Sequence, residues 1–400
     1  MTSWPEVPMG ELVVNRPHAL VIGPFGSDLK VSDYRPAGVP VVFVKNVRPN
    51  AFDASGCQFL NTEKAAKLKA HTVRPGDLII TKMGFPPCVA AIYPRGEPEG
   101  IVTADIIKMS IDQGKALDKY VVHFLNSSAA KEKIERFTFG QTRPKVTLRD
   151  FRELTIPLPQ IGEQRRVAAI LDKADAIRCK NQEAIALTEQ LLRSTFLEMF
   201  GDPVSNPKRW PTKSLGELAT FTGGGTPSRS VPEYFDGATC WATSKDMKGE
   251  VLSDTEEHIT DDAIQNSATK LVPPGTILVV VKSKILMHRL PVLVAAVPTC
   301  FGQDLKGLSL RDSGLTYYVA RHMRIGQDTL LRRARGVNTE GLTLEHLAEY
   351  VVMQPPSEMI DRYVKFELAT TKAARVSREA RADADHLFNS LVQRAFSGQL

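Results

Sequence analysis

The sequence predicts an α+β protein in which one mixed unit of strands and helices occurs twice, each copy followed by a long helix. The first observation behind this prediction is a helical stripe within residues 161–201, where apolar side chains recur every three or four positions. The stripe consists of Val167, Ile170, Leu171, Ala174, Ile177, Ile185, Leu191, Leu192, Phe196, Met199 and Phe200. Its period stays close to 3.5 residues over about ten turns, so we expect a second helix to bury it in a coiled coil.

The second observation is that the chain carries its own partner for this helix. Residues 357–396 hold another stripe, made of Val364, Leu368, Ala374, Ala384, Leu387, Leu391, Val392 and Phe396. Prolines precede both stripes, and a glycine and a proline close the first, as helix boundaries require. Three landmarks recur 196 residues apart: Thr147 as Thr343, Pro159 as Pro355, and Phe200 as Phe396. The two helices therefore match without a gap and need the same reach.

The third observation is that the repeat extends beyond the helices. The segment WPEVPMGEL at 4–12 returns as WPTKSLGEL at 210–218, and PGDLII at 75–80 returns as PGTILV at 274–279. Asp105 and Asp304 occupy matching segments 199 residues apart. Since the offset drifts from 206 to 196, the length differences fall inside the units, where loops tolerate them. A long helical hairpin inside one globule is the alternative, and this wider duplication argues against it.

Each unit is expected to contain strands followed by helices. The β-branched runs separated by glycine and proline turns are residues 39–47, 77–82, 89–93 and 106–111, then 240–243, 276–281, 292–297 and 307–310. We expect a helix over 118–135 capped by Asp118, and another over 313–333 capped by Ser313. Thr147 and Thr343 should cap short helices that lead into a last strand and then the long helix.

Composition points to an acidic partner and a reducing compartment. The net charge of +6 and pI of about 9.0 favour nucleic acid as that partner. Five dispersed cysteines without a CxxC pair suggest free thiols in a cytosolic protein. The sequence opens without a signal peptide, and no apolar run reaches the roughly 18 residues of a membrane span.

Motifs for catalysis, cofactors and metals are missing from the sequence. It contains no GxxxxGK[ST] loop, no GxGxxG after a strand, no GxSxG and no HxxxH or HExxH pair. The glycine-rich stretch 223–227 does not run into an apolar helix, so we interpret it as a surface loop. The eight histidines are far apart, and each is expected to be structural or solvated rather than a metal ligand. We therefore predict no catalytic residues and no metal site.

Basic and amide residues gather at strand ends and loops of both units. In the first unit they are Lys45, Asn46, Arg48, Lys82, Gln141, Arg143 and Lys145. In the second they are Ser228, Arg229, Lys245, Lys248, Lys282, Lys284, Arg289, Arg332, Arg335 and Asn338. Such residues neutralise phosphates and read base edges, so we expect them to bind DNA. An ordinary solvated surface is the alternative for any single residue, and the signal is the pairing of two basic units.

Taken together, these features resemble the specificity subunit of Type I restriction-modification systems. The resemblance covers essentially all 400 residues. It rests on the unit opening WPxxxxGEL, the segment GGTPSRS…EYF…WAT that begins at Gly224, the PGD turn before a strand, and the join IPLPQIGEQRRVAAILDKAD at 156–175. The terminal FSGQL is also similar to the family's.

The resemblance implies a division of labour along the chain. Residues 1–159 and 203–355 would be target recognition domains, each reading one half of a split DNA sequence. Residues 160–202 and 356–400 would be conserved spacer helices, an antiparallel coiled-coil pair that holds the spacing and binds two methyltransferase subunits. The chain itself would be non-catalytic and without a cofactor. S-adenosylmethionine, Mg²⁺ and ATP would belong to methyltransferase and restriction subunits that carry out DNA methylation and defence against foreign DNA in the cytoplasm.

One departure from the family pattern concerns the start of the second helix. Residues 162–165 read GEQR, as in the family, whereas the matching residues 358–361 read EMID, so partner contacts are expected to differ there. Two alternative functions remain open at this point. The chain could be a DNA-recognition adaptor of another defence or modification system, or, as a less favoured reading, a nuclease with an unrecognised active site.

Overall fold

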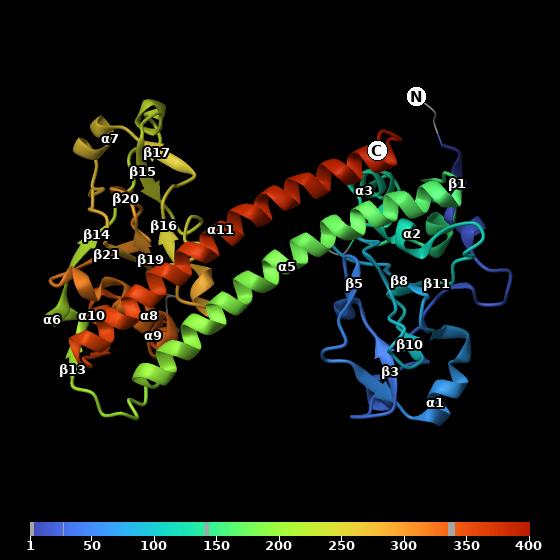
Figure 1. Ribbon diagram of the computed structural model, residues 1–400, viewed down its shortest axis with the longest axis horizontal. Coiled ribbons are helices and arrows are strands. Elements are labelled where there is room, and N and C mark those ends of the chain that lie inside the picture. The colour runs from blue at the N-terminus through green and yellow to red at the C-terminus, as the bar shows by residue number, and fades with distance from the viewer. Residues whose placement is uncertain (1–3, 27, 141–143, 335–340) are drawn as a thin grey trace. The chain divides into compact units, whose positions relative to one another are not determined.

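The structure, a computed structural model, describes residues 4–26, 28–140, 144–334 and 341–400. The chain divides into two compact units, hereafter unit 1 (residues 1–182 and 378–400) and unit 2 (residues 183–377). The two predicted long helices are α5, Ile161–Phe200, and α11, Ser357–Phe396, and each is 40 residues long (Figure 1). Each unit therefore combines one α+β part with a stretch of α5 and a stretch of α11.

Unit 1 contains two four-stranded sheets. One has the strand order β2-β11-β8-β9 and is antiparallel throughout, and the other has the order β6-β3-β10-β7 with β3 and β10 parallel. The strands are β1 Glu6–Pro8, β2 Leu20–Ile22, β3 Val39–Val42, β4 Val47–Arg48, β5 Ala51–Phe52, β6 Gln58–Leu60, β7 Thr72–Val73, β8 Leu78–Thr81, β9 Ala90–Ile92, β10 Gly100–Val102, β11 Ile106–Met109 and β12 Thr155–Pro157. The helices are α1 Thr62–Lys67, α2 Asp118–Leu125, α3 Ser128–Glu135 and α4 Leu148–Glu153.

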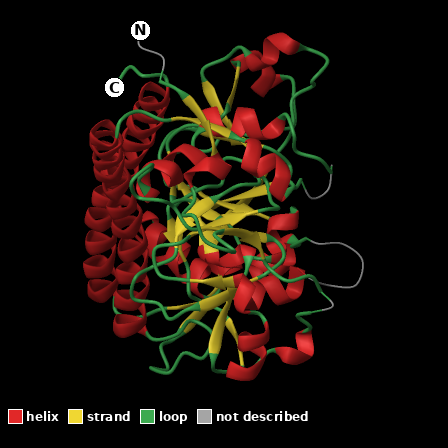
Figure 2. Ribbon diagram, turned by 90° about the vertical axis from the view of Figure 1, so that its right-hand side faces the viewer, coloured by secondary structure: helices red, strands yellow, loops and turns green. Residues whose placement is uncertain are grey.

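Unit 2 repeats this plan with a five-stranded sheet, β14-β21-β18-β19-β16, and a three-stranded one, β17-β15-β20. Its strands are β13 Thr212–Ser214, β14 Ala219–Gly223, β15 Thr239–Ala242, β16 Val251–Leu252, β17 Glu257–Ile259, β18 Ile277–Val280, β19 Val292–Ala295, β20 Thr299–Phe301, β21 Leu305–Leu310 and β22 Val351–Met353. Its helices are α6 Leu215–Leu218, α7 Asp261–Gln265, α8 Thr316–Ile325, α9 Gln327–Ala334 and α10 Leu344–Ala348, shown in red against the yellow strands in Figure 2. The predicted α+β fold class is thus confirmed.

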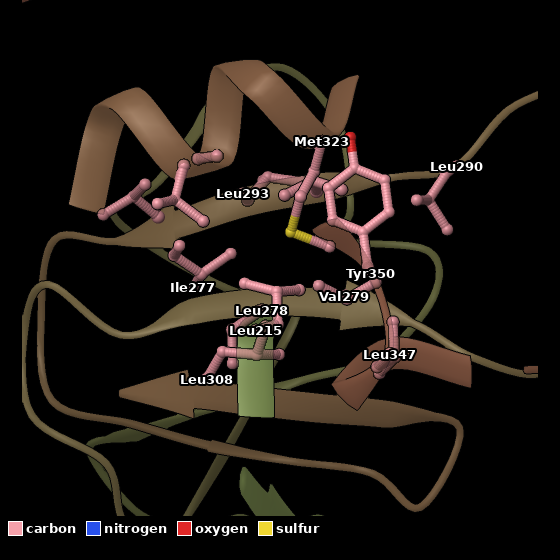
Figure 3. Packing of buried hydrophobic residues seen from close by; sticks show 14 of the residues in the cluster. Leu215, Ile277, Leu278, Val279, Leu290, Leu293, Leu308, Met323, Leu347 and Tyr350 are labelled. Carbon is pink, nitrogen blue, oxygen red and sulfur yellow. The ribbon is translucent and has the colours of Figure 1, made fainter. Parts of the chain in front are cut away.

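Register confirms that the two units are copies of one frame. Ile106 pairs with Thr81 between β11 and β8, and Leu305 pairs with Val280 between β21 and β18, an offset of 199 residues on both strands. In unit 2 the apolar faces of β18, β19 and β21 meet Met323 of α8 and form the core (Figure 3). Every side chain of β18 is buried, which explains its uninterrupted apolar run.

The predicted helix boundaries need two corrections. The 118–135 segment is two helices, α2 and α3, separated at Asn126, and the 313–333 segment breaks at Gly326 between α8 and α9. Asp118 and Ser313 are not the caps, since Leu117 precedes α2 without a side-chain cap and Asp312 caps the 3₁₀ turn before α8. The prediction that Thr147 and Thr343 cap α4 and α10 is confirmed. Each hydroxyl accepts a hydrogen bond from the backbone N–H of the residue three positions later.

The stripe on the long helices is narrower than the sequence suggested. In unit 1 Val167 and Leu171 of α5 are buried in one cluster with Phe388 and Val392 of α11. The two helix segments run antiparallel there, because Arg178 bonds to Asp385 while Arg166 meets the terminal Leu400. In unit 2 Phe196 and Phe200 pack on Tyr363 at ring distances of 5.4 and 5.5 Å.

Four residues assigned to the stripes, Ile177, Leu191, Leu368 and Leu387, are 42–55% exposed instead. Each lies one position away from a more buried residue of the 3.5-residue pattern. It therefore borders the seam, the buried apolar stripe of the helix, without entering it. The helices therefore keep exposed apolar side chains along their flanks.

The glycine-rich stretch 223–227 leaves β14 as a partly exposed loop, as expected, but its Gly224 and Gly225 are packed against other backbone segments. A Cβ on Gly224 would lie 2.1 Å from the carbonyl oxygen of Gly302, and one on Gly225 would lie 2.3 Å from the backbone nitrogen of Thr269. The indole of Trp241 donates a hydrogen bond to the Gly225 carbonyl at 3.1 Å. Glycine is required because two other backbone segments approach this closely.

Candidate nucleic-acid interface

Turn A follows the parallel strand of each unit and presents two exposed basic residues at matching places. It comprises residues 43–48 after β3 in unit 1 and residues 243–248 after β15 in unit 2. Lys45 and Lys245 lie 200 residues apart, as do Arg48 and Lys248. All four side chains are exposed, and the Lys45 ammonium lies 5.5 Å from the centre of the Phe43 ring.

A polar side chain, buried Asn46 in unit 1 and half-buried Asp246 in unit 2, closes each turn A. The Asn46 Oδ1 atom accepts from the Phe43 backbone N–H at 2.9 Å, and the Asp246 Oδ2 atom accepts from the Thr243 N–H at 2.8 Å. Asn46 is fully buried and also donates to the Asp53 carbonyl at 2.8 Å. Asn46 was predicted to contact DNA, and in the structure its amide holds the turn that exposes its neighbours.

A carboxylate accompanies turn A of unit 1. Arg48 lies 3.9 Å from Asp53, and hydrogen bonds from Ser55 together with this arginine lower the pKa of the Asp53 carboxyl below its usual value. Both partners are solvent-exposed, so the ion pair is weak and an incoming phosphate can compete for the arginine.

Turn B follows the antiparallel strand β8 or β18 and pairs with the segment that leads to α4 or α10. It comprises residues 82–84 in unit 1 and 281–283 in unit 2. The Val146 N–H donates to the Lys82 carbonyl at 3.0 Å, and the Leu342 N–H donates to the Val281 carbonyl at 2.7 Å. Lys82 thus corresponds to Val281 in the frame, and Lys145 to Gly341.

A third turn draws turns A and B together within each unit. We call it the link turn, residues 103–105 in unit 1 and 302–304 in unit 2. The Thr103 N–H donates to the Val42 carbonyl at the end of β3, and the Lys82 N–H donates to the Asp105 carbonyl. Gly302 and Asp304 make the same bonds to Ala242 and Val281. Both basic turns therefore leave their strands at the same end of the unit.

Aromatic side chains stand beside the basic ones in unit 1. Phe85, next to turn B, is 78% exposed, and Phe139 is 45% exposed. The Lys145 ammonium lies 5.1 Å from the centre of the Phe139 ring, and Phe139 and Lys145 exchange two backbone hydrogen bonds. Sequence reasoning missed both aromatics, because nothing local shows that a phenylalanine is exposed. Aromatic and cationic groups at one loop end are common where proteins meet nucleic acid.

Unit 2 shows a different set of side chains around turn B. Lys282 is exposed and pairs with Gly341, while Lys284 and Arg289 are exposed in and after the 3₁₀ turn Lys284–Met287. Arg332 is exposed on α9, and its guanidinium donates to the Asp328 carbonyl one turn earlier. Lys282, Lys284 and Arg289 surround one turn, whereas Arg332 belongs to another element.

Ser228 and Arg229 precede the three-stranded sheet, and Arg229 is fully engaged there. Its guanidinium forms a two-fold ion pair with Glu257, which raises the pKa of Arg229 and lowers that of Glu257. It also lies 4.1 Å from the centre of the Phe235 ring. Ser228 is exposed and bonds to Ser230. Arg229 therefore stabilises the sheet face.

Four further residues predicted to bind DNA lie outside the described residues: Gln141, Arg143, Arg335 and Asn338.

Both units anchor their last strand in the same way. The Tyr120 hydroxyl donates to the Pro157 carbonyl at 2.7 Å, and the Tyr318 hydroxyl donates to the Met353 carbonyl at 3.0 Å. Both hydroxyls are buried, so in each unit this bond holds the chain where the last strand leads into the long helix.

No helix among the described residues is long and apolar enough to cross a bilayer.

Comparisons with known proteins agree with this arrangement. The family model described as "Type I restriction modification DNA specificity domain" matches residues 53–189 and again 207–366. The chain is 29% identical over 237 residues to the Type I restriction enzyme EcoR124I/EcoR124II specificity subunit of Escherichia coli, covering 56% of each chain. It is 28% identical over 116 residues to the MjaIX specificity subunit of Methanocaldococcus jannaschii, covering 28% of this chain and 26% of that one. The matches thus span about half the length, or less, of these curated relatives.

A solved structure supports the fold along the whole chain. The Type-I restriction-modification system S subunit from M. genitalium superposes with a TM-score of 0.62 at 14% identity, covering 98% of this chain and 96% of that one. The family resemblance read from the sequence is confirmed by the double match of the family model, once to each repeat. This chain belongs to the Type I restriction modification DNA specificity domain family.

Proposed function

We propose that this chain is the non-catalytic DNA sequence-specificity subunit of a Type I restriction-modification complex. Each unit reads one half of a bipartite double-stranded target. The observation that carries this proposal is the shared frame, in which turns A and B meet at the link turn and expose basic side chains in both units. Membership in a DNA specificity family supports it. The recognition parts are residues 1–159 and 203–355.

The side chains that contact DNA follow from exposure within this frame. In unit 1 they are the exposed Lys45, Arg48 and Lys145 and the half-buried Lys82, and in unit 2 the exposed Lys245, Lys248, Lys282, Lys284 and Arg289. Lysine and arginine at these turns bind phosphates, while the residues that differ between the units read bases. Ser228 and Arg332 remain candidates on neighbouring elements, and Arg229 acts indirectly by holding the sheet.

The long helices, residues 160–202 and 356–400, hold the two readers and bind two methyltransferase subunits. Exposed leucines on their flanks support this role. Leu191 and Leu387 lie 196 residues apart, at the same place in both copies, and are 49% and 55% exposed. Repeated apolar exposure on otherwise polar helix faces is typical of a surface that docks another protein. Two copies of the surface suit two copies of one partner.

Catalysis in this proposal belongs to the partner subunits. Methyltransferase subunits would supply S-adenosylmethionine chemistry, and restriction subunits, where present, would use Mg²⁺ and ATP. The complex would act on DNA in the cytoplasm. Copurification tests the assembly: tagged chain coexpressed with methyltransferase subunits should recover them at two copies per chain. Recovery of no methyltransferase subunit, or DNA cleavage by the chain alone, would contradict the proposal.

DNA binding by the isolated chain tests the electrostatic part. Neutralising about six phosphates should give a slope near −5 in a plot of log affinity against log salt concentration. Fluorescence anisotropy with a labelled duplex between roughly 50 and 200 mM salt measures this slope. A flat response would mean that the basic turns do not contact the DNA backbone.

A further inference from the structure

Three side chains of unit 2 form a compact set of sulfur, oxygen and nitrogen donors outside the basic turns. They are Cys240 on β15, His258 on β17 and Asp254 in the turn before β17. Their ligand atoms all lie within 4.8 Å of one another. The Cys240 Sγ atom is 3.8 Å from the Asp254 Oδ1 atom, and that oxygen is 2.9 Å from the His258 Nε2 atom. We infer that Cys240, Asp254 and His258 bind a zinc ion.

The sheet register places the cysteine and the histidine on one face. Cys240 and His258 are direct partners across the antiparallel pair β15 and β17, so their side chains point the same way. Trp241 and Glu257, one position along, point to the opposite face, where Arg229 binds both. The donor set is therefore separate from the Arg229 cluster.

A second layer of hydrogen bonds holds the aspartate in place. The buried Thr255 hydroxyl accepts from the Trp241 N–H at 3.1 Å and donates to the Glu257 carbonyl at 2.7 Å. The Asp254 carboxylate accepts from the Thr255 N–H at 2.9 Å. The turn is thus tied to both strands that carry the other donors, as is usual around metal ligands.

The donor types and their separations suit zinc. Zinc takes cysteine sulfur at about 2.3 Å and histidine nitrogen or carboxylate oxygen at about 2.0–2.2 Å in a tetrahedron, which sets donor separations of about 3.3–3.7 Å. The observed 3.8 and 2.9 Å lie on either side of these values. Cys240 is buried whereas Asp254 is 76% exposed, so water can reach the open side and supply the fourth ligand.

Binding changes the protonation of the donors. The Cys240 thiol loses its S–H proton to the solvent as the zinc–sulfur bond forms, and His258 binds through Nε2 with its ring proton on Nδ1. The hydrogen bond between Asp254 and His258 is then replaced by two bonds to the metal. The ion would fasten the edge strand β17 to β15.

Unit 1 provides an internal comparison, because the same frame lacks these donors. Pro40 pairs with Phe59 between β3 and β6, at the places of Cys240 and His258. Proline and phenylalanine carry no metal-binding atom. One zinc ion is therefore expected per chain, in unit 2 only. Spacing along the sequence hides the site, since only cross-strand pairing brings Cys240 to His258.

The test titrates the metal-stripped full-length chain with Zn²⁺ and then with Co²⁺. We expect one equivalent of zinc to bind and cobalt to give thiolate charge-transfer absorption. Asp254→Asn, at an exposed position that leaves folding intact, should weaken zinc binding about tenfold or more. Cys240→Ser should abolish the thiolate band. Glu256→Gln, a neighbouring exposed carboxylate, and Cys300→Ser, a buried cysteine on β20, are the matched controls and should bind like the unsubstituted chain.

Either of two results would overturn the site. One is the absence of stoichiometric zinc binding by the unsubstituted chain. The other is binding that Asp254→Asn and Cys240→Ser leave unchanged, which would place the metal on other cysteines. Folding of every variant is checked by circular dichroism, and Asp254→Asn alone decides the matter if Cys240→Ser unfolds. Neither readout involves DNA, so the result is independent of the proposed function.

Discussion

Turn A and turn B behave differently when unit 1 and unit 2 are compared. Turn A keeps a basic residue at both of its exposed places, with Lys45 matched by Lys245 and Arg48 by Lys248. Turn B keeps its backbone hydrogen bonds but replaces Lys82 with Val281 in the frame. Because backbone hydrogen bonds hold the frame, the side chains on it can change without loss of the fold. One fold can thus present two different surfaces.

The junction between each unit and its long helix shows a second contrast. In unit 1 the half-exposed Asp172 of α5 accepts hydrogen bonds from Lys119 and from the buried His123 of α2. In unit 2 the buried Glu367 of α11 bonds to Arg321 of α8 at 2.9 Å. Arg321 also pairs with the buried Glu250 at 2.6 Å, and Arg324 lies near both carboxylates. The charged groups at this junction are therefore buried in unit 2, whereas the carboxylate at the junction of unit 1 is half-exposed.

The largest expected effect separates seam from flank on one helix. Leu192 is 1% exposed, and its carbonyl accepts from the buried Tyr363 hydroxyl at 3.1 Å. Leu192→Asp places an unpaired carboxylate in this seam, so the free energy of unfolding should fall by about 3–5 kcal/mol. Leu191→Asp, at the half-exposed neighbour, should change it by less than about 0.5 kcal/mol. Urea unfolding measures both, and equal effects would mean that the seam is misassigned.

The contrast between the junctions predicts unequal losses. Glu367→Gln leaves Arg321 and Arg324 with one carboxylate between them inside the protein, which should cost about 3 kcal/mol of folding free energy. Asp172→Asn, at a half-exposed site, should cost about 1 kcal/mol or less. Chemical denaturation of the two variants gives the comparison. A larger loss for Asp172→Asn would show that burial does not govern the two networks.

A buried histidine gives unit 2 a source of acid sensitivity that unit 1 lacks at the matching position. Burial lowers the pKa of His322 from 6.5 to about 3, and its Nε2 atom accepts from the Met353 N–H. The unfolded chain binds a proton below about pH 6.5 that the folded chain refuses, so stability falls as pH falls towards 3. The slope from this group is about 1.4 kcal/mol per pH unit. The corresponding position in unit 1 is Phe124, which does not titrate.

Unfolding at pH 7 and pH 5 measures this effect. His322→Gln should be less stable at pH 7, because Tyr350 and Met353 lose their hydrogen bonds to the imidazole ring. The variant should lose less stability than the unsubstituted chain on acidification. If the free energy of unfolding falls equally for both proteins between the two pH values, protonation of His322 is not what destabilises the fold.

The smallest effect concerns turn A, which both units share. Lys45→Ala with Arg48→Ala in unit 1, or Lys245→Ala with Lys248→Ala in unit 2, should each reduce the magnitude of the salt slope of DNA binding by about 2. The two pairs should act alike and irrespective of DNA sequence, because they contact phosphates. Lys180→Ala, on the exposed face of α5, is the control and should leave the slope unchanged. An effect confined to one pair would break the equivalence of the two turns.

Sequence patterns were sufficient for the frame because they are local. The 3.5-residue period predicted α5 and α11, and the constant offset predicted the repeat that places Thr147 and Thr343 as caps. The period did not show that Ile177 and Leu191 border the seam. A shift of one residue along a helix is enough to move a side chain from the buried stripe to its exposed edge.

Residues brought together across strands could not be predicted in this way. Asn46 has the chemistry of a base reader, and only the tertiary fold shows its amide closing turn A. Cys240 and His258 are 18 residues apart and meet through the register of β15 and β17. The equivalence of Lys45 and Lys245 was hidden because the residues around them differ. These placements depend on pairing, which a single sequence does not encode locally.

The central claim is that two copies of one frame read two halves of a DNA target independently. The direct measurement exchanges residues 1–159 for the same unit of a family member with another specificity. The chimera is coexpressed with the methyltransferase subunits, and methylated sites are sequenced in a plasmid library of random targets. The account predicts that one half of the recognised sequence changes while the other half and the spacing between them stay the same. Change in both halves, or in neither, would contradict it.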